Sequence, residues 1–434
     1  MSAMGDRLEK RSARAAVILL AALAAISSGI GWAESSGLPP ARNYKFVNGR
    51  WFDGQGFQRK VFYSVGGVFA ERAPDRIDET VDLKDGFVVP PFADAHNHAI
   101  AGPNNIDKIL KHYLTDGIFY AKNPASIRRD TLQIADKINR PDGVDVVFAN
   151  AGITATGGHP VKLYEQYLNK VKKPGPDGTF ENIAYVIIDN PLDLEKKWPA
   201  ILADRPDFIK GHLLYSEEFE KRRSDPAYYG DKGMNPKVLA LLVAKAHEAG
   251  LRVSCHIETA QDFRNALAVG VDEINHMPGY FPDLKHPDWF PITKEDAEAA
   301  ARKGVVVVTT TYVVADEVKK PDEVARMRAI QAANLKLLRD AGVSIAIGPD
   351  VYTVTALDEA MNLESLKVFD NRTLLKMWCE TSAATIFPKR KIGHLADGYE
   401  ASFLVLGGNP IDRFESVKDI RMRFKQGGFI QLSS

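Results

Sequence analysis

The sequence predicts an α/β protein in which eight βα units form a barrel beside a small β-domain. First, amphipathic segments repeatedly end in glycine and are followed by a β-branched run, as in RKG–VVVVTTT. Second, eight such apolar runs occur between residues 88 and 349. Third, apolar and polar residues alternate between glycine turns in both flanks, 43–87 and 391–432. Eight βα units in one chain favour a (β/α)8 TIM barrel over a doubly wound sheet.

The first 33 residues have the pattern of a secretory signal peptide. Basic residues precede the apolar run 15–30, and Gly31-Trp32-Ala33 supplies small residues for cleavage after Ala33. The run is shorter than the ~20 residues that span a bilayer, so we expect cleavage. The sequence therefore predicts an exported protein, periplasmic or secreted, with no stable membrane span after signal cleavage.

Residues 34–90 and 389–434 are expected to form the two parts of one β-sandwich domain. The stretches VNGRWFDGQG and SVGGVFAE in the first part, and FKQGGFIQ in the second, are typical of short antiparallel strands joined by glycine turns. Because both flanks have this pattern, we expect their strands to pair with each other. The barrel then occupies residues 91–388.

The predicted barrel strands are separated by helices that carry start signals. Thr259 and Thr293 precede helices and have an aspartate three residues on, and Asn235-Pro236 puts proline at a first helical position. The predicted strands are 88–98, 117–122, 145–153, 207–213, 251–257, 272–276, 305–312 and 343–349.

Composition and charge exclude some kinds of function. The 434-residue chain holds 56 Lys and Arg against 56 Asp and Glu, so no basic surface for nucleic acid is expected. Its only cysteines are Cys255 and Cys379, so no disulfide framework holds the fold together. We expect a small-molecule or short-peptide substrate, and the sequence leaves a homo-oligomer open.

Metal-type side chains gather at the carboxyl ends of the predicted barrel strands, where the active sites of TIM barrels lie. His96 and His98 end the first strand and, two residues apart, share one face. Two imidazoles on one face can chelate a divalent metal. Since buried charged groups need a partner or a metal, the whole set predicts a metal site. The later strands contribute Lys210, His256, His276 and Asp350.

With these residues in place, the sequence resembles the metal-dependent amidohydrolase superfamily over about residues 43–430. The features that carry the resemblance are the HxH pair, the lysine, the two further histidines, the final aspartate and the split β-sandwich. The stretches DFIK, GGH and KIGHLADGYEASFLVLGGNP are similar to the imidazolonepropionase-like and Xaa-Pro-dipeptidase-like branch.

The resemblance implies a binuclear metal centre that cleaves an amide or peptide-type C–N bond. The nitrogen and oxygen donors suit zinc, although manganese, cobalt or iron would also fit. The more buried ion would be bound by His96, His98 and Asp350, and the second ion by His256 and His276.

The resemblance also implies roles for Lys210 and Asp350. An ammonium group has no lone pair to donate, so Lys210 would bridge the ions as a carbamate, formed by reaction with carbon dioxide. A metal-bridging hydroxide would attack the substrate carbonyl. Asp350 would take the proton and pass it to the leaving group, acting as general base and then general acid.

Four further residues are candidates for substrate contacts. His159 follows the third strand in TATGGHP, where glycines allow a close backbone approach. His212 and Glu258 stand two residues beyond Lys210 and His256, and so share their faces. Tyr312 ends the seventh strand. His212 is equally consistent with a loop histidine.

Other functions compete with amide hydrolysis. The same hydroxide would serve an esterase, a lactonase or a phosphotriesterase. A deaminase is less consistent with the sequence, because the resemblance associates that reaction with one metal and no bridging lysine. A non-catalytic binding barrel is also possible, but such proteins usually lack one or more ligands, and here all six positions are filled.

Overall fold

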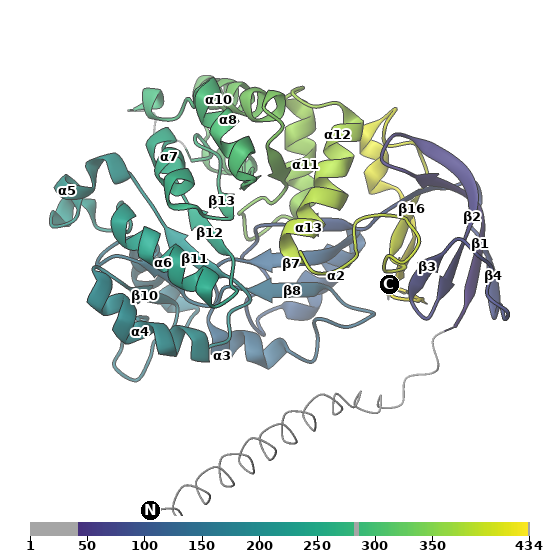
Figure 1. Ribbon diagram of the computed structural model, residues 1–434, viewed down its shortest axis with the longest axis horizontal. Helices are drawn as coiled ribbons and strands as arrows, with labels where there is room; N and C mark the ends of the chain where they lie inside the picture. Colours follow the sequence, from purple (N-terminus) through teal and green to yellow (C-terminus); the bar gives the residue numbers. More distant parts are fainter. Residues whose placement is uncertain (1–41, 282–285, 433–434) are drawn as a thin grey trace, which may run out of the picture. The chain divides into compact units, whose positions relative to one another are not determined.

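Parallel strands form the centre of the structure. The computed structural model describes residues 42–281 and 286–432, whose colours in Figure 1 follow the sequence. The predicted signal peptide, residues 1–33, lies outside the described residues. Within them, no helix combines the length and the apolar character that crossing a bilayer requires.

Two sheets are entirely parallel, so the carboxyl ends of their strands lie at one edge of each sheet. The predicted α/β class with a parallel sheet is confirmed. The three-stranded sheet has the order β6 (Phe92–Asp94), β7 (Ile118–Asn123), β8 (Asp145–Phe148). The seven-stranded sheet has the order β10 (Tyr185–Ile187), β9 (Gly152–Thr154), β11 (Ile209–His212), β12 (Val253–His256), β13 (Glu273–Asn275), β14 (Val306–Val308), β15 (Ser344–Ala346).

Backbone hydrogen bonds join the two parallel sheets at both sides. The amide of Ala95, just after β6, donates to the carbonyl oxygen of Ile347, just after β15, at 2.9 Å. At the other side, the amide of Asp207 donates to the carbonyl oxygen of Phe148 in β8, also at 2.9 Å. The first and last parallel strands are therefore neighbours, although they lie far apart in the sequence.

The helices between the strands begin and end where the sequence places their caps. Thr259 and Thr293 each accept the amide three residues on and form capping boxes, and Asn235 caps an earlier helix, with proline at its first position. Gly270 and Gly304 end two of these helices in the left-handed conformation. The main helices are α2 (Ile106–Thr115), α4 (Pro191–Ala203), α6 (Pro236–Glu248), α7 (Ala260–Val269), α8 (Lys294–Lys303), α10 (Pro321–Asp340) and α11 (Ala356–Ser365).

Two predicted strands are divided in the structure, so their predicted extents were wrong. The range 88–98 becomes β5 (Phe87–Val89) and β6, and 145–153 becomes β8 and β9. Pro90 and Pro91 have no N–H to donate, so one ladder cannot continue from β5 into β6. Asn150 has a left-handed φ of 58°, which turns the chain between β8 and β9. The edge strand β10 was not predicted.

The division of the first strand changes the setting of His96 and His98. Strand β6 ends at Asp94, and both histidines lie in the bend that follows it. The expectation that they share one face of a strand is therefore wrong. Their rings come close because of the bend, with centroids 5.2 Å apart.

A third, eight-stranded sheet combines strands from both flanks of the chain, so purple and yellow segments meet in Figure 1. Strand β16 (Phe403–Leu406) pairs antiparallel with β5 and with β17 (Ile420–Lys425). The arrangement of this sheet as a two-layer sandwich stays a prediction. Its remaining strands are β1 (Tyr44–Phe52), β2 (Phe57–Val65), β3 (Val68–Ala70), β4 (Glu79–Asp82) and β18 (Gly428–Phe429).

Aromatic side chains from both flanks pack together on this sheet. The ring of Phe403 in β16 lies with its centroid 4.9 Å from that of Phe46 in β1 and 5.0 Å from that of Phe424 in β17. Trp51 packs on the same ring at 5.4 Å. All four side chains are fully buried. Since buried aromatic rings contribute large apolar areas, each flank stabilises the other.

One buried carboxylate shapes the turn that follows β14. Glu359 on α11 accepts hydrogen bonds from the hydroxyls of Thr309 and Thr311 and from two backbone amides of the turn, at 2.5–2.8 Å. Thr310 lies inside this turn with a φ of 48°, and its hydroxyl is 3.0 Å from His276 Nδ1. Glu359 therefore positions a turn that contacts one of the metal-type histidines.

We expect Glu359→Gln to lower the free energy of unfolding by about 1–3 kcal/mol, the usual cost of leaving buried hydrogen-bonding groups unsatisfied. The glutamine NH₂ group would face hydroxyl and amide donors that the Glu359 carboxylate accepts in the unaltered protein. Chemical denaturation followed by tryptophan fluorescence measures the change. Glu364→Gln on the same helix is the control, because it removes only an ion pair to Lys367, whose side chain is 72% exposed. Equal losses in the two variants would contradict the assignment.

Candidate functional site

Asp350 lies against three histidines beyond the carboxyl ends of the strands. Its Oδ1 is 3.0 Å from His98 Nε2 and 3.2 Å from His96 Nε2, and its Oδ2 is 3.6 Å from His276 Nδ1. Asp350 and His276 both have left-handed backbones, with φ of 54° and 75°. Residues that sequence analysis assigned to the first, sixth and eighth barrel strands thus meet at one point.

A close backbone approach brings the first and last of these segments together. The amide of Asp350 donates to the carbonyl oxygen of His96 at 3.2 Å. A Cβ atom at Gly348 would lie 2.4 Å from the backbone nitrogen of His96, so any other residue there would force the backbone apart. The glycine in the GPD stretch therefore permits the contact between Asp350 and the histidines.

Three more histidines form a second group around Lys210. The ring centroid of His256 lies 4.7 Å from that of His159 and 5.5 Å from that of His212. One ligand atom from each of these residues lies within 4.8 Å of the others, as is also true of His96, His98 and Asp350. Sequence analysis grouped His256 with His276, and that pairing stays a prediction.

His276 belongs to neither of these two groups of ligand atoms. Its ring lies between them, with centroids 4.6 Å from His96 and 4.5 Å from His256. His159 and His212 lie beside His256 and belong to the second group of ligand atoms. Their predicted role as substrate contacts stays a prediction.

The hydrogen bonds of two histidines show how their rings face the site. His212 Nδ1 is 2.9 Å and His98 Nδ1 is 3.4 Å from a backbone carbonyl oxygen, of Ile153 and Ala125 respectively. Because a carbonyl only accepts, Nδ1 carries the proton and Nε2 keeps a lone pair. His98 Nε2 then faces the Asp350 carboxylate oxygen, which also has lone pairs. A cation held between the two atoms satisfies both.

Burial keeps the histidine rings neutral. It lowers the pKa of His96 and His159 to about 4. It also lowers the pKa of His212, His256 and His276 well below the usual value for histidine. Desolvation disfavours the charged imidazolium, so at pH 7 each ring offers a lone pair to a metal ion.

Lys210 is held at the floor of the site by a buried polar network. Its Nζ donates to Asn275 Oδ1 at 2.6 Å, and Asn275 Nδ2 donates to Glu273 Oε1 at 2.7 Å. The carboxylate of Glu273 also accepts from Lys122 Nζ at 2.7 Å, from the Ser254 hydroxyl at 2.9 Å and from the Thr385 hydroxyl at 2.6 Å. The carboxylate accepts only, so the Asn275 amide must present its oxygen to Lys210. Burial lowers the pKa of Lys210 to about 7.

Glu258 lies beside His256, as its spacing predicts, whereas Tyr312 begins a helix instead of ending the seventh strand. A substrate contact by either residue stays a prediction. Glu258 is buried against His256, with Oε1 3.2 Å from Nε2, and accepts the hydroxyl of Tyr280 at 3.0 Å. Burial raises the pKa of Glu258 well above its usual value. Tyr312 begins α9 (Tyr312–Glu317) and is not among the described residues that line the site.

Sequence analysis missed Asn275 and Tyr280. The Tyr280 ring stacks on that of His276, with centroids 4.0 Å apart. Neither residue is of a metal-binding type, and the only signal in the sequence was their nearness to His276.

The metal-type residues line one cavity of about 210 Å³. The nitrogen and oxygen donors of its walls fit a pair of divalent ions of the zinc type. Their roles stay predictions, but the cavity brings together eight of the ten residues named from the sequence. These eight are His96, His98, His159, Lys210, His212, His256, His276 and Asp350.

Comparisons with known sequences point to one family. The model of the amidohydrolase family named Amidohydro_3 matches residues 216–424. A putative amidohydrolase of Bacillus subtilis (strain 168), YtcJ, is 24% identical over 212 residues, which are 44% of this chain. The match covers only 39% of the length of that relative.

Solved structures of similar fold cover most of the chain. An amidohydrolase has a TM-score of 0.69 at 19% identity, covering 90% of this chain and 100% of its own. A Xaa-Pro dipeptidase with methionine bound in its active site has a TM-score of 0.67 at 18% identity, with the same coverage. The A. niger ochratoxinase has a TM-score of 0.69 at 17% identity, covering 90% of this chain and 96% of its own.

At these identities the solved structures are evidence for the fold alone, and the evidence for the family comes from the sequence matches. The family model and the curated relative agree with the fold that the chain adopts. Together, the matched segment, the curated relative and the fold support the amidohydrolase superfamily for this chain.

Proposed function

We propose that this amidohydrolase is an exported, metal-dependent enzyme that cleaves an amide or peptide-type C–N bond. The observation that carries the proposal is the cavity in which two groups of three nitrogen and oxygen donors flank Lys210. The similarity to the Xaa-Pro-dipeptidase-like branch and the fold of a Xaa-Pro dipeptidase support a C–N bond as the target. Export rests on the signal pattern of residues 1–33, and N-terminal sequencing of the mature protein, expected to start near Glu34, tests it.

The scaffold proposed for this activity is a closed (β/α)8 barrel with a split β-sandwich beside it. The hydrogen bonds from Ala95 to Ile347 and from Asp207 to Phe148 support closure, because they link the two parallel sheets at both sides. The eight-stranded sheet shared by the flanks supports the second domain.

The residues that would hold two ions are His96, His98 and Asp350 for the first and His256 and His276 for the second, with Lys210 as the bridge. His159 and His212 offer further donor atoms beside His256. Bound divalent ions, for which the donor types suit zinc, would polarise a carbonyl group and lower the pKa of a water molecule. Lys210 can bridge only as a carbamate: its neutral amine adds to carbon dioxide, one N–H proton is lost to solvent, and the two oxygens of the product share a single negative charge. Asn275 would keep the lysine nitrogen in place during this reaction, since its oxygen is fixed toward Nζ.

Asp350 is the proton carrier in this proposal. Its carboxylate lies within 3.2 Å of two histidine Nε2 atoms, at the centre of the donor set. A carboxylate there accepts a proton from the attacking water and returns it to the leaving nitrogen.

The first test of the proposal is metal content. Purified protein should contain close to two divalent ions per chain by elemental analysis, because the cavity offers two donor groups. A chelator should remove the metal and abolish the hydrolysis of N-acyl amino acids and dipeptides. Added zinc should restore both the metal content and the activity. Active protein without stoichiometric metal would exclude the mechanism. Matched esters, lactones and phosphotriesters in the same assay show whether C–N bonds are preferred.

We expect Asp350→Asn to lower kcat by at least ~10²-fold, the usual scale for loss of a general base. Asparagine keeps one carbonyl oxygen but cannot take up the proton, so part of the metal should remain bound. Steady-state kinetics together with metal analysis separate the two effects. A near-normal kcat would remove Asp350 from proton transfer.

Lys210→Ala should lose most activity, because the bridge between the two ions is gone. Acetate or propionate at high concentration with excess metal should restore part of it, since a small carboxylate offers two oxygens at similar spacing. Acetamide is the control and should restore nothing. A fully active Lys210→Ala enzyme would show that the lysine has only a structural role and would contradict the two-metal proposal.

A further inference from the structure

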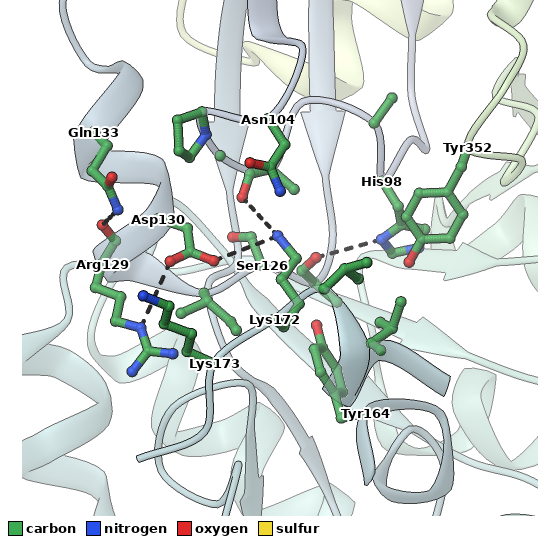
Figure 2. Close-up of a pocket in the computed structure, with 18 residues that line it drawn as sticks. His98, Asn104, Ser126, Arg129, Asp130, Gln133, Tyr164, Lys172, Lys173 and Tyr352 are labelled. Atoms are coloured by element: carbon green, nitrogen blue, oxygen red, sulfur yellow. Dashed lines mark hydrogen bonds and ion pairs between the residues drawn. The ribbon is translucent and has the colours of Figure 1, made fainter. Parts of the chain in front are cut away.

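A second and larger cavity opens beside the donor groups. Its volume is about 670 Å³, enough for a drug-sized ligand. It shares His98, Ala125, Tyr164 and Tyr352 with the smaller cavity, so the two are neighbours across a common wall. Figure 2 shows this larger cavity, with His98 and Tyr352 at one side. A substrate that passes His98 and Tyr352 would reach from Asp350 into the larger cavity.

The charged side chains of this larger cavity are mostly cationic. Arg129, Lys172 and Lys173 line it against a single carboxylate, Asp130. These three positive charges and one negative charge leave a formal charge of +2. Concave walls of one charge sign concentrate the electric field, so the cavity attracts anions.

Lys172 is the cation that is placed most firmly inside. Its side chain is 21% exposed, and its Nζ lies 3.4 Å from the carbonyl oxygen of Ala101 and 3.5 Å from Asp130 Oδ2. Both distances are at the outer limit of a hydrogen bond. An ammonium group has three donors, so Lys172 keeps capacity for a stronger acceptor.

An independent observation comes from Ser126, which lines the same cavity. The residue is 1% exposed, and its hydroxyl has no hydrogen-bond partner among the described residues. Buried hydroxyls normally have a partner, because an unsatisfied one costs free energy. A ligand oxygen in the cavity would supply it.

We propose that this cavity is a subsite for a carboxylate that the substrate carries several bonds away from the scissile bond. The carboxylate would accept hydrogen bonds from Lys172 Nζ and the Ser126 hydroxyl, while Arg129 and Lys173 at the exposed rim attract it. The substrate class is then an amide with a distal acidic group, such as an acidic side chain or a dicarboxylic acyl chain. The assignment to a substrate rests on the proposed hydrolase function.

Binding of glutarate and its monoamide, glutaramate, to the metal-loaded full-length protein tests the subsite without any turnover. Both probes offer one carboxylate to the donor groups and differ only at the distal end. By calorimetry at low salt, glutarate should bind about tenfold more tightly, because a charge-assisted hydrogen bond replaces a neutral one. The preference should shrink as salt screens the cations.

Lys172→Gln should reduce the preference for glutarate to about twofold or less. Ser126→Ala should weaken the binding of glutarate by about threefold. It should not lower thermal stability, since the hydroxyl that it removes has no partner in the protein's described residues. Lys170→Gln is the matched control, because Lys170 is exposed on the same segment and does not line the cavity. Equal binding of the two probes by the unaltered protein, or a preference that Lys172→Gln leaves intact, would overturn the proposal.

Assays of dipeptide hydrolysis test the anion subsite and the hydrolase function separately. The dipeptide Gly-Glu should have a lower KM than Gly-Gln with the unaltered protein, and Lys172→Gln should raise the KM of Gly-Glu alone. If neither dipeptide nor any N-acyl amide is cleaved while glutarate still binds selectively, the hydrolase function fails and the anion subsite stands. Cleavage of both dipeptides with equal KM overturns the subsite and leaves the hydrolase function.

Discussion

The contact between the segments after β6 and after β15 is the constraint on which the site depends. Three features hold it: the hydrogen bond from Ala95 to Ile347, the hydrogen bond from Asp350 to His96, and the absence of a side chain at Gly348. Without this contact the carboxylate of Asp350 would not reach His96 and His98. The two histidines follow the first parallel strand of the sequence, and Asp350 follows the last one. The neutral rings and the carboxylate then form a set whose lone pairs all face one cavity, and a cation is the natural partner for such a set.

The polar network beneath Lys210 explains why that lysine tolerates burial. Glu273 gathers hydrogen bonds from Lys122, Ser254 and Thr385 and so fixes the amide of Asn275. A buried network with every member satisfied is rigid, because no alternative partner is available in the low-dielectric interior. The lysine nitrogen thus has a defined position before any ion or carbon dioxide arrives.

Local signals in the sequence predicted local structure well. Capping residues such as Thr259 and Thr293 mark the helix starts, because their hydroxyls act within one turn of the chain. The metal-type residues were found because they end apolar runs. The bend that carries His96 and His98 and the left-handed backbone of Asp350 were not predicted, since distant segments impose them. Asn275 was missed for the same reason: its side-chain oxygen accepts from Lys210, which lies 65 residues earlier in the chain.

The pairing of β5 with β16 has a consequence for how the protein is made. Strand β5 ends just before the two prolines that lead into β6, and its partner lies at 403–406, near the end of the chain. A ribosome releases the N-terminal strands long before β16 exists, so the eight-stranded sheet can be completed only after synthesis has reached β16. Long-range pairing of this kind slows folding. Until β16 has formed, β5 presents an open sheet edge, and an open edge can pair with another chain.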